Sequence, residues 1–328
     1  NNRISIANDV LQFQNLSFVK LDVASPEIAG FIATEKPDIF YHLGQIPSAP
    51  YSMKNVDQAV HTISNNELGN TRIVWALRKY SPDCHLIKLG SFGEYYSEDL
   101  DIAEGYFQPS YNGRKSISQV PFPREADDVY HITKINDSNI LSMACRQWGL
   151  RVSEIMQATI FGIGIEENLK HSGLYNRFDC DHSFGTVVNR FVTQALCERE
   201  LTVYGSGKQR TGLMYLNDAI ESLAMISKTY PQRGQHKIIN HVSEKDFCIS
   251  EIADVVVKIA KKHNLNILIK YGDNPRNENV ITKKKYSIET TIVKNVTPIE
   301  KAVDEMFCLI KKFKDRIQPE YLKVGNPW

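Results

Sequence analysis

The chain has 328 residues, with 39 Lys and Arg against 38 Asp and Glu, and 42% of its residues are hydrophobic. The net charge of +1 excludes the strongly basic balance of a general nucleic-acid binder. The chain has no run of about 18 apolar residues, the length needed to cross a membrane, and it does not open with a signal-peptide pattern. Its histidines and cysteines are not spaced like metal ligands. We therefore expect no membrane span, no metal and free thiols in a reducing compartment, the cytoplasm or, in a photosynthetic eukaryote, the plastid stroma.

Strand and helix patterns alternate through the first half of the chain. We expect strands at 17–23, 38–44, 84–90 and 151–160, and helices at 26–36, 66–80 and 129–148. Strands separated by helices of this length predict crossover units and a parallel sheet. The fold prediction is a doubly wound, Rossmann-like α/β domain over 1–162, in which ligands bind beyond the carboxyl ends of the strands.

The pattern changes after Gly162, where a polar, loop-like stretch begins. We expect helices at 181–199, 217–229, 250–263 and 298–313, with a short strand and glycine-rich turn at 201–207. A strand at 236–242 is expected to rejoin the first sheet. This half predicts a smaller α/β substrate domain over 163–328, threaded through the first.

A tyrosine and a lysine lie four residues apart on the expected helix 129–148. Tyr130 and Lys134 would share one helix face, and an ammonium beside a phenol favours the phenolate. Such a tyrosine can exchange a proton with a sugar hydroxyl while hydride leaves the carbon. The spacing also fits a plain exposed pair, and a second copy at Tyr204 and Lys208 spans a glycine turn that cannot be a regular helix.

Context favours the catalytic interpretation, because Ser91 follows the strand at 84–90 and would lie at its carboxyl end. Ser91, Tyr130 and Lys134 in this order resemble the extended short-chain dehydrogenase/reductases, the NAD-dependent epimerase/dehydratase family, and most of all their UDP-sulfoquinovose synthase branch. The matching runs extend through most of the chain, at 48–53, 88–95, 130–134, 177–181, 184–186, 189–191, 202–205 with Gln209, 274–276 and 313–316.

The resemblance implies a reaction on a UDP-hexose. NAD would take hydride from C4 while Tyr130 removes the hydroxyl proton and Ser91 holds the reacting oxygen. Water would then leave across C5 and C6, and in the sulfoquinovose enzymes sulfite adds at C6. Glu94 and His131 match residues near the sugar and are candidates for the C5 and C6 proton transfers. Alternatively, Glu94 supports the site from behind and His131 only packs beside the tyrosine.

The resemblance also implies binding residues. Those expected to contact NAD are Asp22, Val23, His42, Gly44, Tyr130 and Lys134. Those expected to contact the nucleotide sugar are Ser48, Gln157, Arg177, Thr202, Tyr204, Gln209, Arg210 and Arg276. Arg suits a diphosphate because it binds phosphate with two parallel hydrogen bonds. The run at 202–205 could equally be an ordinary strand and turn.

Three departures from the branch lie where the nicotinamide, the sugar and the sulfur donor would meet, and two of them, at Pro47 and Arg210, concern anion handling. Arg210 stands one residue before the family's phosphate-binding arginine, Pro47 replaces an arginine, and Gln45-Ile46 replaces Glu-Gln. Use of sulfite or a sulfite donor therefore stays open. The alternatives are a nucleotide-sugar 4-epimerase or dehydratase without sulfonation, and a non-catalytic Rossmann-like binding protein.

Two expectations concern assembly. No GxGxxG or GxxGxxG run is present to hold a pyrophosphate, and the strands at 17–23 and 38–44 would be the third and fourth of a Rossmann sheet. We therefore expect roughly 55–65 residues carrying the first βαβ unit to precede Asn1. The helices at 66–80 and 129–148 match those that pair subunits in the superfamily, so we expect a homodimer.

Overall fold

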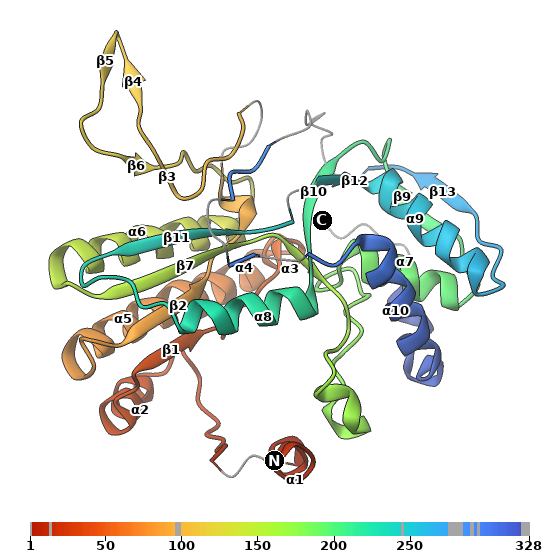
Figure 1. The fold of residues 1–328 in the computed structure, drawn as a ribbon, viewed down its shortest axis with the longest axis horizontal. Coiled ribbons are helices and arrows are strands. Elements are labelled where there is room, and N and C mark those ends of the chain that lie inside the picture. Colours follow the sequence, from red (N-terminus) through yellow and green to blue (C-terminus); the bar gives the residue numbers. More distant parts are fainter. Residues whose placement is uncertain are drawn as a thin grey trace.

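A computed structural model describes residues 2–12, 15–95, 100–243, 246–274, 285–288, 292–293 and 296–322. Its largest sheet has four strands in the order β1-β2-β7-β11, and every neighbouring pair is parallel (Figure 1). The strands are β1 (Ile39–His42), β2 (His85–Leu89), β7 (Arg151–Gln157) and β11 (His236–His241). The predicted parallel α/β fold is therefore confirmed.

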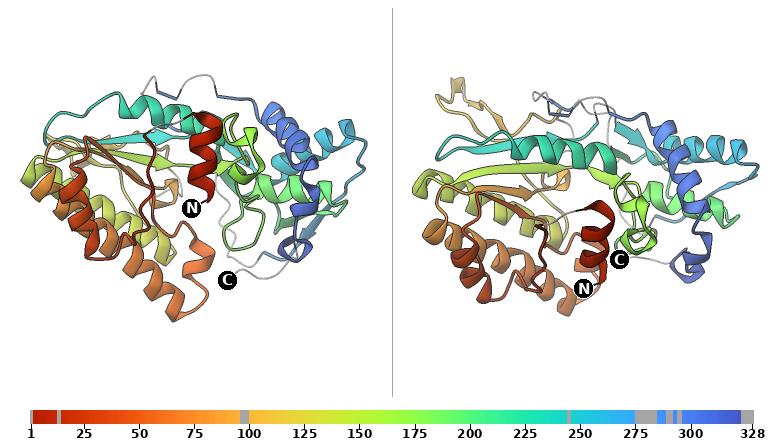
Figure 2. Two further views of the ribbon diagram at one scale, coloured as in Figure 1. Left: turned by 90° about the horizontal axis from the view of Figure 1, so that it is seen from below. Right: turned by 60° about the horizontal axis from the view of Figure 1, so that its bottom comes forward.

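Helices cover both faces of this sheet (Figure 2). On one face of the sheet, Leu86 of β2 and Val152 of β7 belong to a buried cluster with three helices. On the opposite face, Ile87 of β2 and Ile155 of β7 pack with one helix. This division follows from the alternation of side chains along a strand. The helices of the first face are α2 (Glu27–Glu35), α5 (Gly69–Tyr80) and α6 (Val129–Trp148), and that of the second is α8 (Leu216–Ser227).

The chain leaves the main sheet at Ala158 and enters a second group of strands. There β8 (Thr159–Phe161) pairs in parallel with β10 (Arg210–Tyr215), which pairs antiparallel with β12 (Asp246–Cys248). A separate pair joins β9 (Leu201–Tyr204) and β13 (Ile269–Gly272). The helices packed on these strands share one large apolar cluster; they are α7 (Val187–Leu196), α9 (Ile249–Lys262) and α10 (Ile299–Lys311).

Local chemistry sets the bounds of α6, the helix that carries the tyrosine and lysine. Its N-cap is Asp128, whose Oδ1 accepts the backbone N–H of His131 at 2.9 Å. The helix ends at Gly149, which adopts the left-handed conformation with φ 74°. The second copy of the motif is a turn, because Gly205 and Gly207 also have positive φ.

Two predicted elements are wrong. Residues 17–23 form no strand, and the large side chains Phe18 and Val19 are about half exposed, so no sheet buries them. The helix expected from residue 181 begins only at Val187. Asp181 instead accepts the backbone N–H groups of residues 183 and 184, and this turn competes with a helix.

The helix predicted at 66–80 begins earlier than expected. It runs continuously from α4 (Val56–Ile63) through a π-helical segment at Ser64–Leu68 into α5. A π-helical segment inside an α-helix is rare and is frequently found at functional sites.

Shorter elements complete the described chain. An arm of paired strands projects from the main sheet (Figure 1); it comprises β3 (Tyr106–Phe107), β4 (Ser110–Tyr111), β5 (Arg114–Lys115) and β6 (Val120–Pro121). The helix α1 (Asn2–Leu11) packs near Leu174, whose carbonyl accepts from Arg3, and α3 (Ala49–Ser52) follows β1. Among the described residues, no helix is long and apolar enough to cross a membrane.

Candidate active site

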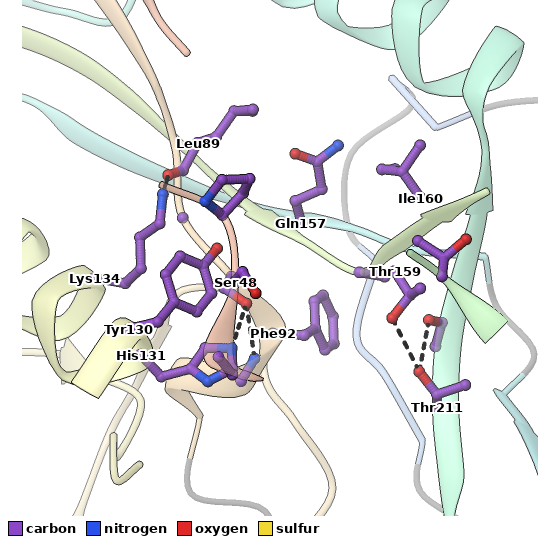
Figure 3. Close-up of a pocket in the computed structure, with 18 of the residues that line it drawn as sticks. Ser48, Leu89, Phe92, Tyr130, His131, Lys134, Gln157, Thr159, Ile160 and Thr211 are labelled. Carbon is purple, nitrogen blue, oxygen red and sulfur yellow. Dashed lines mark hydrogen bonds between the residues drawn. The ribbon is translucent and has the colours of Figure 1, made fainter. Parts of the chain in front are cut away.

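A cavity of about 570 Å³ opens at the carboxyl ends of β1, β2 and β7 and extends to β8 and β10 (Figure 3). The segments following these strands and the first turns of α6 form its walls. Eight of the predicted functional residues line it: His42, Ser48, Ser91, Tyr130, His131, Lys134, Gln157 and Arg210.

Tyr130 and Lys134 lie together on α6 at one side of the cavity (Figure 3), and Ser91 also lines it. The Lys134 Nζ lies 5.6 Å from the centroid of the Tyr130 ring and donates to the Leu89 carbonyl at 2.8 Å. The neighbouring Ser91 side chain acts to lower the pKa of Tyr130. These are the positions that proton exchange with a bound hydroxyl requires.

Burial decides the ionisation of this pair in the free protein. It lowers the pKa of Lys134 to about 7, with help from the like charge of Lys88. It raises the pKa of Tyr130, and the hydrogen bond from Ser91 only partly opposes this effect. The expected lowering of the tyrosine pKa is therefore not found, because desolvation and the Glu94 and Asp128 carboxylates together outweigh the effect of Ser91.

His131 lies beside the tyrosine, with 4.7 Å between the ring centroids. Its Nδ1 is 2.6 Å from Asp128 Oδ2, and its Nε2 is 3.2 Å from Ser91 Oγ. A Cβ at Gly93 would stand 2.2 Å from that Nε2, so only glycine leaves room for the ring. The imidazole is thus held on three sides, with Asp128 fixing its orientation.

Glu94 lies beneath the cavity and does not line it. Its carboxylate is fully buried, contacts Arg124 at 2.6 Å, and accepts the backbone N–H of Ser91 at 2.7 Å. Burial and the nearby Glu154 carboxylate raise the pKa of Glu94. This placement favours the alternative in which Glu94 supports the Ser91 turn from behind.

Two residues at the lysine were not among those predicted from the sequence. Gln45 accepts from Lys134 Nζ at 2.5 Å. Asn66, in the π-helical segment, accepts from the backbone N–H of Ile46 at 2.8 Å and donates to Thr133 at 3.1 Å. Asn66 stands in the polar run Ser64-Asn65-Asn66-Glu67, so no signal in the sequence marked it as buried.

The residues expected to bind NAD fall into two groups. His42 lines the cavity, and both of its ring nitrogens are buried without a partner in the described part of the chain. Burial, with Lys134 and Lys88 adding, lowers the pKa of His42 to about 3. Asp22 is exposed. The adjacent Val23 packs against Gly44, just after β1, where an added Cβ would lie 3.0 Å from the Val23 side chain.

These features fit one end of a dinucleotide. The Lys134 ammonium has three hydrogens and donates to two acceptors, Gln45 and Leu89, so one hydrogen is left for a ligand. His42 lines the same cavity, and its two ring nitrogens are buried without a partner among the described residues. A ribose bearing a nicotinamide suits such a wall. The glycine-rich turn that would hold the pyrophosphate is not in this sequence.

The residues expected to bind the nucleotide are less concentrated. Arg210 reaches the cavity, but its guanidinium makes two contacts with the Asp246 carboxylate, at 2.6 and 3.0 Å. Arg177 lines a neighbouring cavity and pairs with Asp179 at 2.6 Å. In this structure both arginines are therefore paired with carboxylates of the chain itself.

Thr202, Tyr204 and Gln209 do not line the first cavity. Thr202 is buried on β9, and Gln209 donates to the Tyr204 carbonyl at 2.9 Å, which ties the turn to the strand end. Arg276 lies outside the described residues. Pro47, which replaces an arginine in the branch, does line the cavity.

The model of the NAD dependent epimerase/dehydratase family matches residues 2–240 of the chain. UDP-sulfoquinovose synthase of Spinacia oleracea chloroplasts is 31% identical over 333 residues, covering 99% of this chain and 68% of its own length. UDP-sulfoquinovose synthase of Sulfolobus acidocaldarius is 37% identical over 244 residues, covering 74% of this chain and 61% of its own. The chain thus spans about two thirds of these relatives.

Solved structures share the fold at lower identity. UDP-glucose 4-epimerase of Thermotoga maritima, with UDP-glucose, gives a TM-score of 0.69 at 15% identity, covering 92% of this chain and 86% of that one. UDP-glucuronic acid 4-epimerase of Bacillus cereus, with UDP-glucuronic acid and NAD, gives 0.66 at 15% identity, covering 93% and 85%.

Proposed function

The chain belongs to the NAD dependent epimerase/dehydratase family, and we propose that it oxidises C4 of a UDP-hexose and then eliminates water across C5 and C6. The reaction resembles that of UDP-sulfoquinovose synthase. The observation that carries this proposal is the convergence of Ser91, Tyr130, His131 and Lys134 in one cavity at the carboxyl ends of the parallel strands.

Tyr130 is the residue that exchanges a proton with the C4 hydroxyl. Ser91 donates to or accepts from the same oxygen, since its hydroxyl already contacts both the tyrosine and the imidazole. The ammonium of Lys134 stabilises the phenolate form of Tyr130, which takes up this proton and becomes a neutral phenol. Bound NAD supplies the hydride acceptor, and Lys134 with His42 would hold its nicotinamide ribose.

His131 is the acid/base group for the elimination. Asp128 holds Nδ1, which leaves Nε2 directed toward Ser91 and the cavity. An imidazole in this orientation can take the C5 proton that the 4-keto group has acidified and give it to the C6 hydroxyl, which leaves as water. Glu94 then acts through the Ser91 turn, as a positioning residue.

We propose that the two parts of the chain bind different ligands. Residues 1–162, with the strand at 236–242, bind the cofactor, and residues 163–328 bind the nucleotide sugar. Arg276 is the diphosphate-binding arginine of this proposal. A reducing compartment such as the cytoplasm or the plastid stroma is consistent with six cysteines that are all free thiols.

A second candidate is an epimerase or dehydratase that stops short of sulfonation. Pro47 presents neither a charge nor a backbone N–H to an anion in the cavity. Arg210 is already neutralised by Asp246. Sulfite would therefore find less positive charge here than the arginine of the sulfoquinovose branch would offer.

Homodimerisation is part of the proposal. Large apolar side chains are exposed along the continuous helix of α4, the π-helical segment and α5, and on α6. They are Val56, Val60, Ile63, Leu68, Trp75 and Ile132. Exposed apolar side chains on neighbouring helices are what a subunit contact would cover. A monomer by sedimentation at micromolar concentration would contradict this part.

One incubation separates the two candidates. The protein is supplied with UDP-glucose and NAD, with and without sulfite, and the products are identified by mass spectrometry. A 4-keto or unsaturated product without sulfite, and a sulfonated hexose with it, would support the first candidate. An epimer or unsulfonated product in both arms would support the second, and no change in the sugar would refute both.

A further inference from the structure

The side chain of Gln45 lies between two charged groups beneath the candidate catalytic pair. Its Oε1 accepts from Lys134 Nζ at 2.5 Å, and its Nε2 donates to Asp137 Oδ2 at 2.6 Å. The same Nε2 also lies 3.2 Å from the Asn66 carbonyl. Gln45 itself is placed by the turn that follows β1, and it lines the cavity.

A carboxamide serves both neighbours at once. An amide has a carbonyl that accepts and an NH₂ group that donates, whereas an ionised carboxylate only accepts and an apolar side chain does neither. The ammonium needs an acceptor, and the Asp137 carboxylate needs a donor. The two neighbours therefore fix which end of the amide points at which group.

Lys134 is surrounded by ionisable groups from every element packed against it. They are Tyr130 and Asp137 of α6, Lys88 of β2, Glu94 after β2, Glu154 of β7 and His42 of β1. Lys88 sits 3.3 Å from Asp137 and 3.5 Å from Glu154, with no exposed side-chain surface on any of the three. Asp137 thus already has a cationic partner, and the nearest acceptors of Lys134 are the uncharged oxygens of Gln45 and Leu89.

We propose that Gln45 is a positioning residue for Lys134, and that its neutral amide fixes both the place and the charge of that ammonium beside Tyr130. The inference rests on the proposed function, in which the ammonium stabilises the tyrosine phenolate. Because the pKa of Lys134 is about 7, small changes at its acceptors alter the charged fraction at neutral pH.

Two substitutions of similar size should move the lysine in opposite directions. Gln45→Met removes the acceptor, and a hydrogen bond to a charged group corresponds to a pKa change of about one to two units. The pKa of Lys134 should therefore fall by about that amount. Gln45→Glu places a carboxylate at the ammonium, and the pKa of Lys134 should rise.

The lysine can be observed without turnover. Labelling with acetic anhydride over a range of pH, followed by mass spectrometry of the peptide carrying Lys134, reports the pH at which its amine becomes free. Gln108→Glu, on the exposed arm, adds the same charge far from the cavity and is the matched control. We expect a downward shift for Gln45→Met, an upward shift for Gln45→Glu and no shift for the control.

Turnover then tests the consequence. With half of the lysine charged at pH 7, a fall of about one to two units reduces the ammonium, and with it kcat, by about five- to fiftyfold, while KM for the sugar changes little. The alkaline limb of the pH profile of kcat should move to lower pH for Gln45→Met and to higher pH for Gln45→Glu. A merely structural role would lower kcat in both variants without opposite shifts.

The outcomes separate this inference from the proposed function. Unshifted labelling of Lys134 in both variants would overturn the role of Gln45, whatever the activity. Opposite labelling shifts in a protein that transforms no nucleotide sugar would uphold Gln45 and refute the proposed reaction. If Gln45→Met fails to fold, Gln45→Glu alone decides through the direction of its labelling shift.

Discussion

Replacing Asp128 by Asn tests whether His131 takes part in the chemistry. The carboxylate performs two tasks, since one oxygen caps α6 and the other lies 2.6 Å from His131 Nδ1. Asparagine is as good an N-cap as aspartate, so the helix should keep its start. The substitution removes the negative charge beside the imidazole. It also leaves the orientation of the ring less fixed, because an amide can turn its NH₂ group toward Nδ1.

The expected loss follows from this one contact. A hydrogen bond to a charged group contributes about 1.5–3 kcal/mol, and each 1.36 kcal/mol corresponds to a tenfold change in rate. We therefore expect kcat for elimination to fall by about 10- to 100-fold in Asp128→Asn. KM for the nucleotide sugar should stay within about threefold, because Asp128 does not line the cavity.

The assay follows release of the C5 proton into deuterated water by NMR, with the unfolding midpoint in urea measured in parallel. Asp254→Asn, on the exposed side of α9, makes the same substitution outside the site and should leave both quantities unchanged. A fully folded Asp128→Asn protein that exchanges the C5 proton at the parental rate would refute the assignment of His131 as the acid/base group.

Three further substitutions test the surroundings of the site. Arg124→Met removes the cation paired with the buried Glu94 carboxylate and one of the two near Glu154, which keeps Lys88. It should lower the free energy of unfolding in urea by about 3–5 kcal/mol, and an unchanged midpoint would contradict the buried network. Gly93→Ala forces the ring of His131 from its place and should reduce kcat more than stability, which kinetics and thermal melting compare. Burial lowers the pKa of His241 to about 4, below the ordinary value of 6.5, so its contribution to stability is present above pH 6.5 and is lost as the pH falls. The stability advantage over His241→Gln should therefore shrink by about 2 kcal/mol between pH 6.5 and pH 5, and a constant difference in urea titrations would contradict this.

The helix caps and apolar patterns in the sequence predicted the main helices and strands correctly where the same residues are also packed against neighbouring elements in the fold. The helix of Tyr130 was expected at 129–148 and is found with those bounds, since Asp128 and Gly149 supply both of its caps. The strand expected at 17–23 failed for the converse reason. Its alternating apolar residues carry a strand pattern, but no described strand pairs with them, and propensity without a partner does not make a sheet.

Residue types in the site were predictable, whereas their partners were not. Spacing placed Ser91, Tyr130 and Lys134 at one edge of a parallel sheet. Nothing local could indicate that Arg210 would be paired with Asp246, because that contact joins two strands distant in sequence. The role of Gln45 was hidden for the same reason, since its two partners lie on α6.

The central claim is that Tyr130 removes the C4 hydroxyl proton as hydride leaves. The most direct measurement mixes the protein and NAD with UDP-glucose carrying deuterium at C4, in a single turnover, and follows the near-ultraviolet absorbance of reduced nicotinamide. The protein should show a transient whose rate is slowed by the deuterium. Tyr130→Phe should lose about 10²–10⁴ in that rate while binding UDP-glucose within a few fold. A transient of undiminished rate in Tyr130→Phe, or none at all in the unsubstituted protein, would contradict the account.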